Sequence, residues 1–125
     1  MPKIGVVGVG GWGKNHLRVL NDLNSLSCFC DIDESKIKIF EEKYHVKGYK
    51  SLDEMLKNEK LDAITICTPS ATHYGIAEKT IKSGLDTFVE KPLTYKSIEG
   101  ERLVELAKEK NVILTVGFIE RFNPA

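Results

Sequence analysis

Short apolar runs alternate with amphipathic stretches along the whole chain. Runs rich in apolar residues predict buried strands at residues 3–8, 26–31, 46–49, 63–67, 85–90 and 112–116. Between them, apolar side chains recur every three or four residues, which predicts helices at about residues 12–23, 33–44, 51–56, 70–82 and 98–111. Strands separated in this way by helices predict a parallel sheet covered on both faces. Right-handed crossovers make this a doubly wound α/β domain of about six strands, which we expect to occupy residues 1–125.

Polar residues and glycines mark the ends of the predicted helices. Asp33, Ser51 and Ser70 each stand where an N-cap side chain would accept a hydrogen bond from the first helical turn. Gly84 and Asn111 follow the last apolar positions of two helices, where a left-handed residue commonly ends the helix. These signals support the predicted alternation of strands and helices.

The composition indicates a globular protein and excludes several partners. The 125 residues suffice for one domain with its own core, and 42% of them are apolar. Lys and Arg together number 18, as do Asp and Glu, so the chain has no net charge that would favour nucleic acid or a membrane surface. There is no apolar run of about 18 residues that could span a bilayer. We therefore expect neither nucleic acid nor a membrane as a partner.

The three cysteines favour buried thiols. Cys28 and Cys30 alternate on one predicted strand, and neighbours of this kind have poor geometry for a disulfide. No set of ligands at metal-binding spacing accompanies them or Cys67, so we predict no metal site. Buried free thiols are typical of a reducing compartment, and we expect a cytoplasmic protein.

A glycine-rich turn joins the first predicted strand to the first helix. Gly8, Gly10 and Gly13 form the pattern G-x-G-x-x-G, with Gly11 and Trp12 inside it. In this context the first glycine permits a tight turn, the second lets a pyrophosphate approach the backbone, and the third lets the helix pack closely on the sheet. The helix N-terminus then favours the diphosphate. The turn predicts a Rossmann dinucleotide site, although Trp12 fits a packing role as well as a binding role.

The second strand ends in an acidic residue that indicates which dinucleotide is bound. Asp31 lies 23 residues after Gly8, close to the spacing of about 20 at which a carboxylate binds the adenosine ribose hydroxyls. The same carboxylate would repel the 2′-phosphate of NADP, and no Arg follows nearby. Lys36 and Lys38 would soften that repulsion. We predict NAD as the cofactor, with NADP less favoured.

Three further motifs stand at the carboxyl ends of predicted strands, where doubly wound proteins carry their chemistry. TPSATH at 68–73 follows the fourth strand, EKP at 90–92 ends the fifth, and VGFIERFNPA at 116–125 begins at the last residue of the sixth, so that residues 118–124 follow that strand. With GVGGWG and CDID they cover essentially the whole chain in a fixed order. In these motifs the sequence resembles the glucose–fructose oxidoreductase, inositol dehydrogenase and rhizopine-catabolism family, the Gfo/Idh/MocA family.

The resemblance implies an oxidoreductase that transfers a hydride between NAD(P) and a secondary hydroxyl of a sugar, a nucleotide sugar or a cyclitol. It implies that Lys91 lies beside the nicotinamide and hydrogen-bonds the reacting hydroxyl, as the catalytic residue. It also implies cofactor contacts from the remaining motif residues, namely Thr68, Pro69, Ser70, His73, Glu90, Lys91, Pro92 and Arg121. GGWGKNH and ERFNPA most resemble members that act at C3 of nucleotide-linked N-acetylhexosamines.

The family has a second α/β domain, which binds substrate and supplies further acid–base groups. This chain ends at Ala125, where that domain is expected to begin. The resemblance therefore implies that the chain alone binds NAD but turns over little or no substrate, because positioning and proton transfer are both incomplete. It further implies that the full-length protein is a homo-oligomer.

Two alternatives remain open at this point. A regulatory NAD(H)-sensing module would have a similar length, glycine turn and acidic residue, without catalysis. A structural or assembly domain would bind no dinucleotide. The EKP and TPSATH motifs count against the regulatory module, which needs no catalytic lysine.

Overall fold

The computed structural model describes residues 2–90 and 97–117, which form one parallel sheet with helices on both sides. The strands are β1 Ile4–Val7, β2 Leu26–Cys30, β3 Lys47–Tyr49, β4 Ala63–Ile66, β5 Asp86–Glu90 and β6 Leu114–Gly117. The helices are α1 Gly11–Asp22, α2 Glu34–Tyr44, α3 Leu52–Asn58, α4 His73–Lys82 and α5 Ser97–Lys110, with a 3-10 turn, η1, at Ser70–Thr72. The predicted α/β fold is confirmed.

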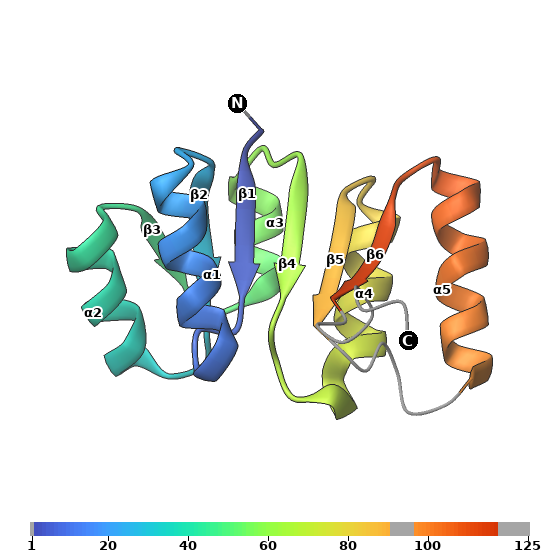
Figure 1. Ribbon diagram of the computed structural model, residues 1–125, viewed down its shortest axis with the longest axis horizontal. Coiled ribbons are helices and arrows are strands. Elements are labelled where there is room, and N and C mark those ends of the chain that lie inside the picture. Colours follow the sequence, from blue (N-terminus) through green and yellow to red (C-terminus); the bar gives the residue numbers. More distant parts are fainter. Residues whose placement is uncertain (1, 91–96, 118–125) are drawn as a thin grey trace, which may run out of the picture.

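The strand order is β3-β2-β1-β4-β5-β6, and every neighbouring pair is parallel (Figure 1). The order reverses between β1 and β4, because the chain crosses from β3 back past β1 to start the second half of the sheet. Doubly wound sheets bind ligands outside the carboxyl ends of the strands at such a reversal. The topology therefore places the candidate site at the ends of β1 and β4.

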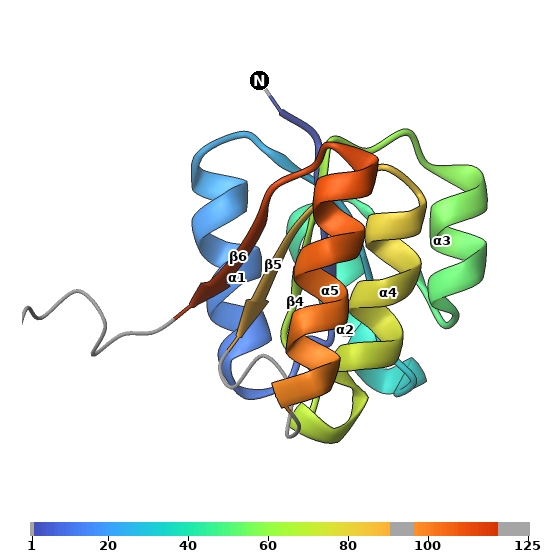
Figure 2. The same cartoon turned by 90° about the vertical axis from the view of Figure 1, so that its right-hand side faces the viewer.

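Helices cover the two faces unequally (Figures 1 and 2). One apolar cluster lies between the sheet and α1 and α2, and includes Val6, Leu17 and Phe29. The other, larger cluster lies under α3, α4 and α5, and includes Ile66 and Ile81. Adjacent residues of one strand enter opposite clusters, as expected for a strand buried on both faces.

The helix ends follow most of the predicted signals. The Asp33 carboxylate accepts a hydrogen bond from the Ser35 N–H, and the Ser51 hydroxyl accepts one from the Glu54 N–H. Gly84, which follows the C-cap residue of α4, and Asn111, which follows α5, have positive φ angles of 80° and 57°. The predicted caps at Asp33 and Ser51, and the two predicted helix ends, are confirmed.

The helix predicted to begin at Ser70 begins later. Ser70 opens the 3-10 turn, and α4 begins three residues later with Thr72 as its N-cap. Pro69 fixes the backbone at the start of this turn, and the Thr72 hydroxyl donates to the Pro69 carbonyl at 2.7 Å. The turn shifts the start of the helix away from Ser70.

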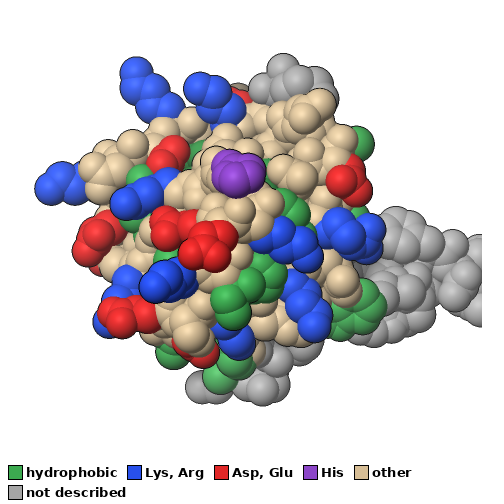
Figure 3. Space-filling model, turned by 90° about the vertical axis from the view of Figure 1, so that its left-hand side faces the viewer, with side chains coloured by type: hydrophobic (Ala, Val, Ile, Leu, Met, Phe, Trp, Pro, Cys, Tyr) green, Lys and Arg blue, Asp and Glu red, His purple; other side chains and the backbone are tan. Residues whose placement is uncertain are grey.

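Charged side chains of both signs are mixed on the surface. Figure 3 shows acidic and basic side chains interspersed over the face formed by α2, without a large patch of one sign. None of the helices in the described part of the chain is long and apolar enough to cross a membrane.

Cys28 and Cys30 are buried, Cys67 is partly buried, and all three are free thiols. Residues 2–90 and 97–117 also contain no group of three or more His, Cys, Asp or Glu arranged to hold a metal.

Candidate dinucleotide-binding site

A pocket of about 1070 Å³ opens along the carboxyl ends of β1, β2, β4 and β5. This volume lies just above the usual range of about 300–1,000 Å³ for sites that bind small molecules and cofactors. The topology thus brings together segments that lie far apart in the sequence. The pocket is lined by eight of the residues predicted to bind the cofactor, namely Gly8, Gly10, Gly11, Trp12, Asp31, Thr68, Pro69 and Glu90.

The glycine turn has the close packing that the motif requires. A Cβ atom added to Gly13 would lie 1.8 Å from the Gly8 carbonyl oxygen, so α1 contacts the turn too tightly for any side chain. Gly8 has a φ angle of 88°, a left-handed conformation that L side chains rarely adopt. Gly13 therefore acts through packing, and it does not line the pocket.

Gly10 leaves an open approach to the start of α1. A Cβ added there would meet only the ammonium nitrogen of Lys36, at 3.2 Å, and no backbone atom within 4 Å. No side chain caps the first turn of α1, and that turn contains no acidic residue. The first N–H groups of a helix lack intrahelical partners and carry positive potential. This end of the helix is therefore well suited to an anionic diphosphate.

The Asp31 carboxylate is held in a fixed orientation at the pocket wall. One oxygen accepts a hydrogen bond from the Val9 N–H and the other accepts one from the Asp33 N–H, both at 2.9 Å. Each carboxylate oxygen can accept a further hydrogen bond, so hydroxyl groups of a ligand can still bind. Asp31 thus links the glycine turn to the loop after β2 and presents a preorganised acceptor.

Charged groups of both signs surround this end of the pocket. Hydrogen bonds from the Ser35 side chain and backbone hold the pKa of the exposed Asp33 carboxyl below its usual value. Lys36 and Lys50 also line the pocket, and Lys50 pairs with Glu34 at 2.7 Å. The Lys36 ammonium group therefore lies close to Gly10, at the N-terminus of α1.

The segment after β4 forms a compact turn on the other side of the pocket. The Thr72 hydroxyl lies 2.7 Å from both the Thr68 hydroxyl and the Pro69 carbonyl oxygen. His73 is only 1% exposed, and its Nε2 lies 2.8 Å from the Thr68 carbonyl oxygen. His73 therefore supports the turn from inside the protein, whereas Thr68, Pro69 and Thr72 line the pocket.

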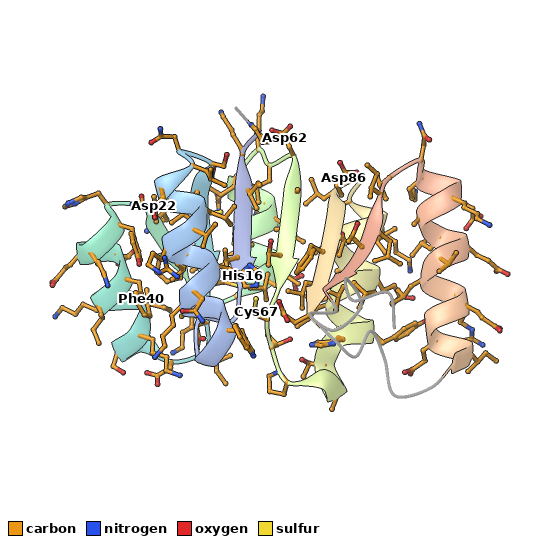
Figure 4. The ribbon with its side chains drawn as sticks, viewed as in Figure 1. His16, Asp22, Phe40, Asp62, Cys67 and Asp86 are labelled. Carbon is orange, nitrogen blue, oxygen red and sulfur yellow. The ribbon has the colours of Figure 1, made fainter. Side chains whose placement is uncertain are left out.

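Glu90, the last residue of β5, has a partner that the motifs did not reveal. His16 Nε2 on α1 lies 2.9 Å from Glu90 Oε1. Figure 4 shows His16 and Cys67 near the carboxyl ends of β1 and β4. Burial and, to a smaller extent, the Glu90 carboxylate raise the pKa of the Cys67 thiol to about 12. The only sequence signal for His16 is its position on the helix that follows the glycine turn.

Several predicted site residues cannot be placed. Lys91, Pro92 and Arg121 lie outside the described residues, and the side chain of Ser70 is not described either. Trp12 is described, is 57% exposed and lines the pocket, which favours the binding alternative over the packing alternative.

Comparison with known families agrees with this geometry. Residues 2–118 match the model of the Gfo/Idh/MocA family, described as an oxidoreductase family with an NAD-binding Rossmann fold. The chain belongs to this family. UDP-N-acetylglucosamine 3-dehydrogenase of Acidithiobacillus ferrooxidans is 29% identical over 98% of the chain and 39% of its own length. Myo-inositol 2-dehydrogenase of Thermotoga maritima is 32% identical over 97% of the chain and 37% of its own length. The chain thus spans about two fifths of these relatives.

Solved structures show the same likeness. The WlbA dehydrogenase of Chromobacterium violaceum, crystallised with NADH and UDP-GlcNAcA, superposes with a TM-score of 0.90 at 27% identity. The match covers 98% of the chain and 36% of that protein. Membership of an oxidoreductase family does not favour the alternative of a regulatory module without catalysis.

Proposed function

We propose that this chain is the NAD-binding domain of an oxidoreductase that exchanges a hydride between NAD and a secondary hydroxyl of a sugar, nucleotide sugar or cyclitol. The observation that carries the proposal is the junction of the glycine turn and the Asp31 carboxylate in one pocket. The Val9 N–H of the turn donates directly to Asp31, so the predicted diphosphate and ribose positions are held together. A glycine-rich turn without a ligand needs neither this contact nor the pocket around it.

The described residues divide the pocket into parts with different roles. Asp31 accepts hydrogen bonds from the adenosine ribose, and the backbone around Gly10 and the start of α1 receives the diphosphate. The remaining half of the dinucleotide must then extend toward the ends of β4 and β5. Thr68, Pro69 and Glu90 line the pocket there. We assign this part of the pocket to the nicotinamide.

The charges favour NAD over NADP. Asp31 and Asp33 place two carboxyl groups at the wall where a 2′-phosphate would lie, and both line the pocket. Lys36 and Lys50 offset part of this negative charge, but Lys50 is paired with Glu34. Two like charges at about 4 Å repel by roughly 4 kcal/mol at an effective dielectric constant of 20, and less where solvent screens them. This repulsion is the basis of the expected preference.

The catalytic step is proposed from the family motif. Bound nicotinamide supplies the hydride acceptor or donor, and Lys91 polarises the substrate hydroxyl and exchanges a proton with it. Substrate specificity belongs to the whole protein. UDP-N-acetylglucosamine 3-dehydrogenase and the inositol dehydrogenases, both similar to this chain, support a sugar-type substrate. A homo-oligomeric, cytoplasmic protein remains part of the proposal, and the free thiols support a reducing compartment.

Trp12 provides a direct test, because it is the only tryptophan in the chain and it lines the pocket. Reduced nicotinamide absorbs where tryptophan emits, so bound NADH should quench Trp12 emission and emit by energy transfer. We expect a saturable signal that excess NAD⁺ reverses. A signal that rises linearly with NADH and does not respond to NAD⁺ would show absorption by free NADH and would contradict the proposal.

A further inference from the structure

The interaction between His16 and Glu90 joins two parts of the fold that the sequence separates by 74 residues. His16 belongs to α1, the helix that follows the glycine turn, and Glu90 ends β5. Both side chains are half-buried, with exposed fractions of 25% for His16 and 18% for Glu90. The contact therefore connects the helix that receives the diphosphate to the strand end assigned to the nicotinamide.

The hydrogen-bond donor and acceptor of this contact can be assigned. Because carboxylate oxygens accept hydrogen bonds, we assign the hydrogen of this 2.9 Å contact to Nε2 of His16. The His16 ring also packs on Phe88, with ring centroids 5.7 Å apart. Phe88 and Glu90 are two residues apart on β5 and project to the same face of the sheet. His16 thus packs on one residue of β5 and hydrogen-bonds the next residue on that face.

Glu90 is the acidic side chain at this end of the described pocket. Asp31 and Asp33 line its opposite end, after β2. Oxidised nicotinamide carries a positive charge on its ring and reduced nicotinamide does not. A carboxylate held near the ring therefore stabilises NAD⁺ relative to NADH, and the effect depends on how firmly the carboxylate is held there.

We propose that His16 is a positioning residue, which holds the Glu90 carboxylate toward the nicotinamide part of the pocket and so sets the relative affinity for NAD⁺ and NADH. This inference rests on the proposed function, because it requires the pocket to bind the dinucleotide. It assigns to His16 a role that packing alone does not provide. A packing residue would affect both oxidation states of the cofactor equally.

Two substitutions at His16 separate hydrogen bonding from packing. His16→Phe keeps an aromatic ring against Phe88 and removes the donor. His16→Gln keeps an N–H donor at a similar reach and removes the ring. Glu90→Gln keeps the size of the acceptor side chain and removes its charge. Thermal unfolding of each variant identifies any loss of folded protein before binding is measured.

The affinities of NAD⁺ and NADH for the whole 125-residue chain are then compared by calorimetry. We expect His16→Phe to weaken NAD⁺ binding about fivefold and NADH binding less than twofold. His16→Gln should restore both affinities to within about twofold of the unaltered chain. Glu90→Gln should weaken NAD⁺ about tenfold. The double variant His16→Phe/Glu90→Gln should be no weaker than Glu90→Gln alone, because His16 acts through Glu90.

The outcomes distinguish this inference from the proposed function. If the unaltered chain binds neither form, the proposed function is wrong and the inference is overturned with it. If the unaltered chain binds both forms, and His16→Phe changes neither affinity or changes the two equally, only the inference is overturned. Independent, additive effects of the two substitutions would also overturn it.

Discussion

Replacing Gly10 by alanine should separate dinucleotide binding from the stability of the fold. The backbone at Gly10 is extended, with a φ angle of −84°, so alanine adopts it without strain. The added Cβ would meet only the end of the Lys36 side chain, which is flexible and can move away. We therefore expect the free energy of unfolding to change by less than about 0.5 kcal/mol, as for other tolerated surface substitutions.

The same methyl group should obstruct the diphosphate. Its carbon would project into the pocket at the point where phosphate oxygens must approach the backbone. Pushing the phosphates outward would break one or two hydrogen bonds to a charged group, each worth about 1.5–3 kcal/mol. The resulting loss of about 1.5–6 kcal/mol corresponds to an affinity at least roughly tenfold lower. NADH titration and chemical unfolding of the same variant measure the two effects.

Two other glycines are the matched controls. At Gly13 the added Cβ would lie 1.8 Å from the Gly8 carbonyl oxygen, and a backbone atom cannot move aside cheaply. Gly13→Ala should therefore destabilise the fold by about 2 kcal/mol or more. Gly75 lies within α4 with nothing within 4 Å of an added Cβ, so Gly75→Ala should stabilise by about 0.5–1 kcal/mol and leave binding unchanged. Unchanged NADH affinity in folded Gly10→Ala would refute this account of the turn.

Three further predictions concern a helix cap and the thiols. Ser51→Ala removes the acceptor for the Glu54 N–H and should cost about 1 kcal/mol in urea unfolding; a loss below the measurement error would show that the cap contributes nothing. Cys67 should react slowly with iodoacetamide at pH 8, because its pKa is raised to about 12, and NADH should slow it further; rapid reaction of the folded chain, read by mass spectrometry, would contradict this. The pKa of Cys30 is also raised to about 12, whereas a thiol in the unfolded chain has a pKa of about 8.5. The protonated Cys30 thiol therefore contributes stability that is fully present below about pH 8.5 and is lost as the pH rises toward 12. Cys30→Ala should accordingly flatten the decline in the free energy of unfolding above about pH 9.

The fold was largely predictable because its signals are local. The apolar runs that predict β1, β2 and β4 are buried on both faces, and each is followed by a helix, whereas Ile113 in the run of the edge strand β6 is 65% exposed. Gly84 and Asn111 end their helices in left-handed conformations, as the sequence indicates. The start of α4 was not predictable from Ser70, because a 3-10 turn, in which the Thr72 hydroxyl bonds back to Thr68 and Pro69, precedes the helix.

The candidate site was predictable where a residue type and its spacing carry the chemistry. Asp31 and the glycine turn are of this kind, and they lie in one pocket. The His16–Glu90 contact could not be predicted, because it depends on where the tertiary fold places α1 relative to the end of β5, 74 residues along the chain. The burial of the His73 side chain could not be predicted either, because the position of a polar residue after a strand does not indicate which way its side chain points.

The most direct test of the central claim is a titration of the unaltered chain with NADH and with NADPH, with Asp31→Asn measured beside it. Asparagine keeps the size of the side chain and removes the charge that opposes a 2′-phosphate. We predict that the unaltered chain binds NADH at least about tenfold more tightly than NADPH, and that Asp31→Asn narrows the difference by weakening NADH and strengthening NADPH. Binding of neither dinucleotide, or tighter binding of NADPH by the unaltered chain, would contradict the account.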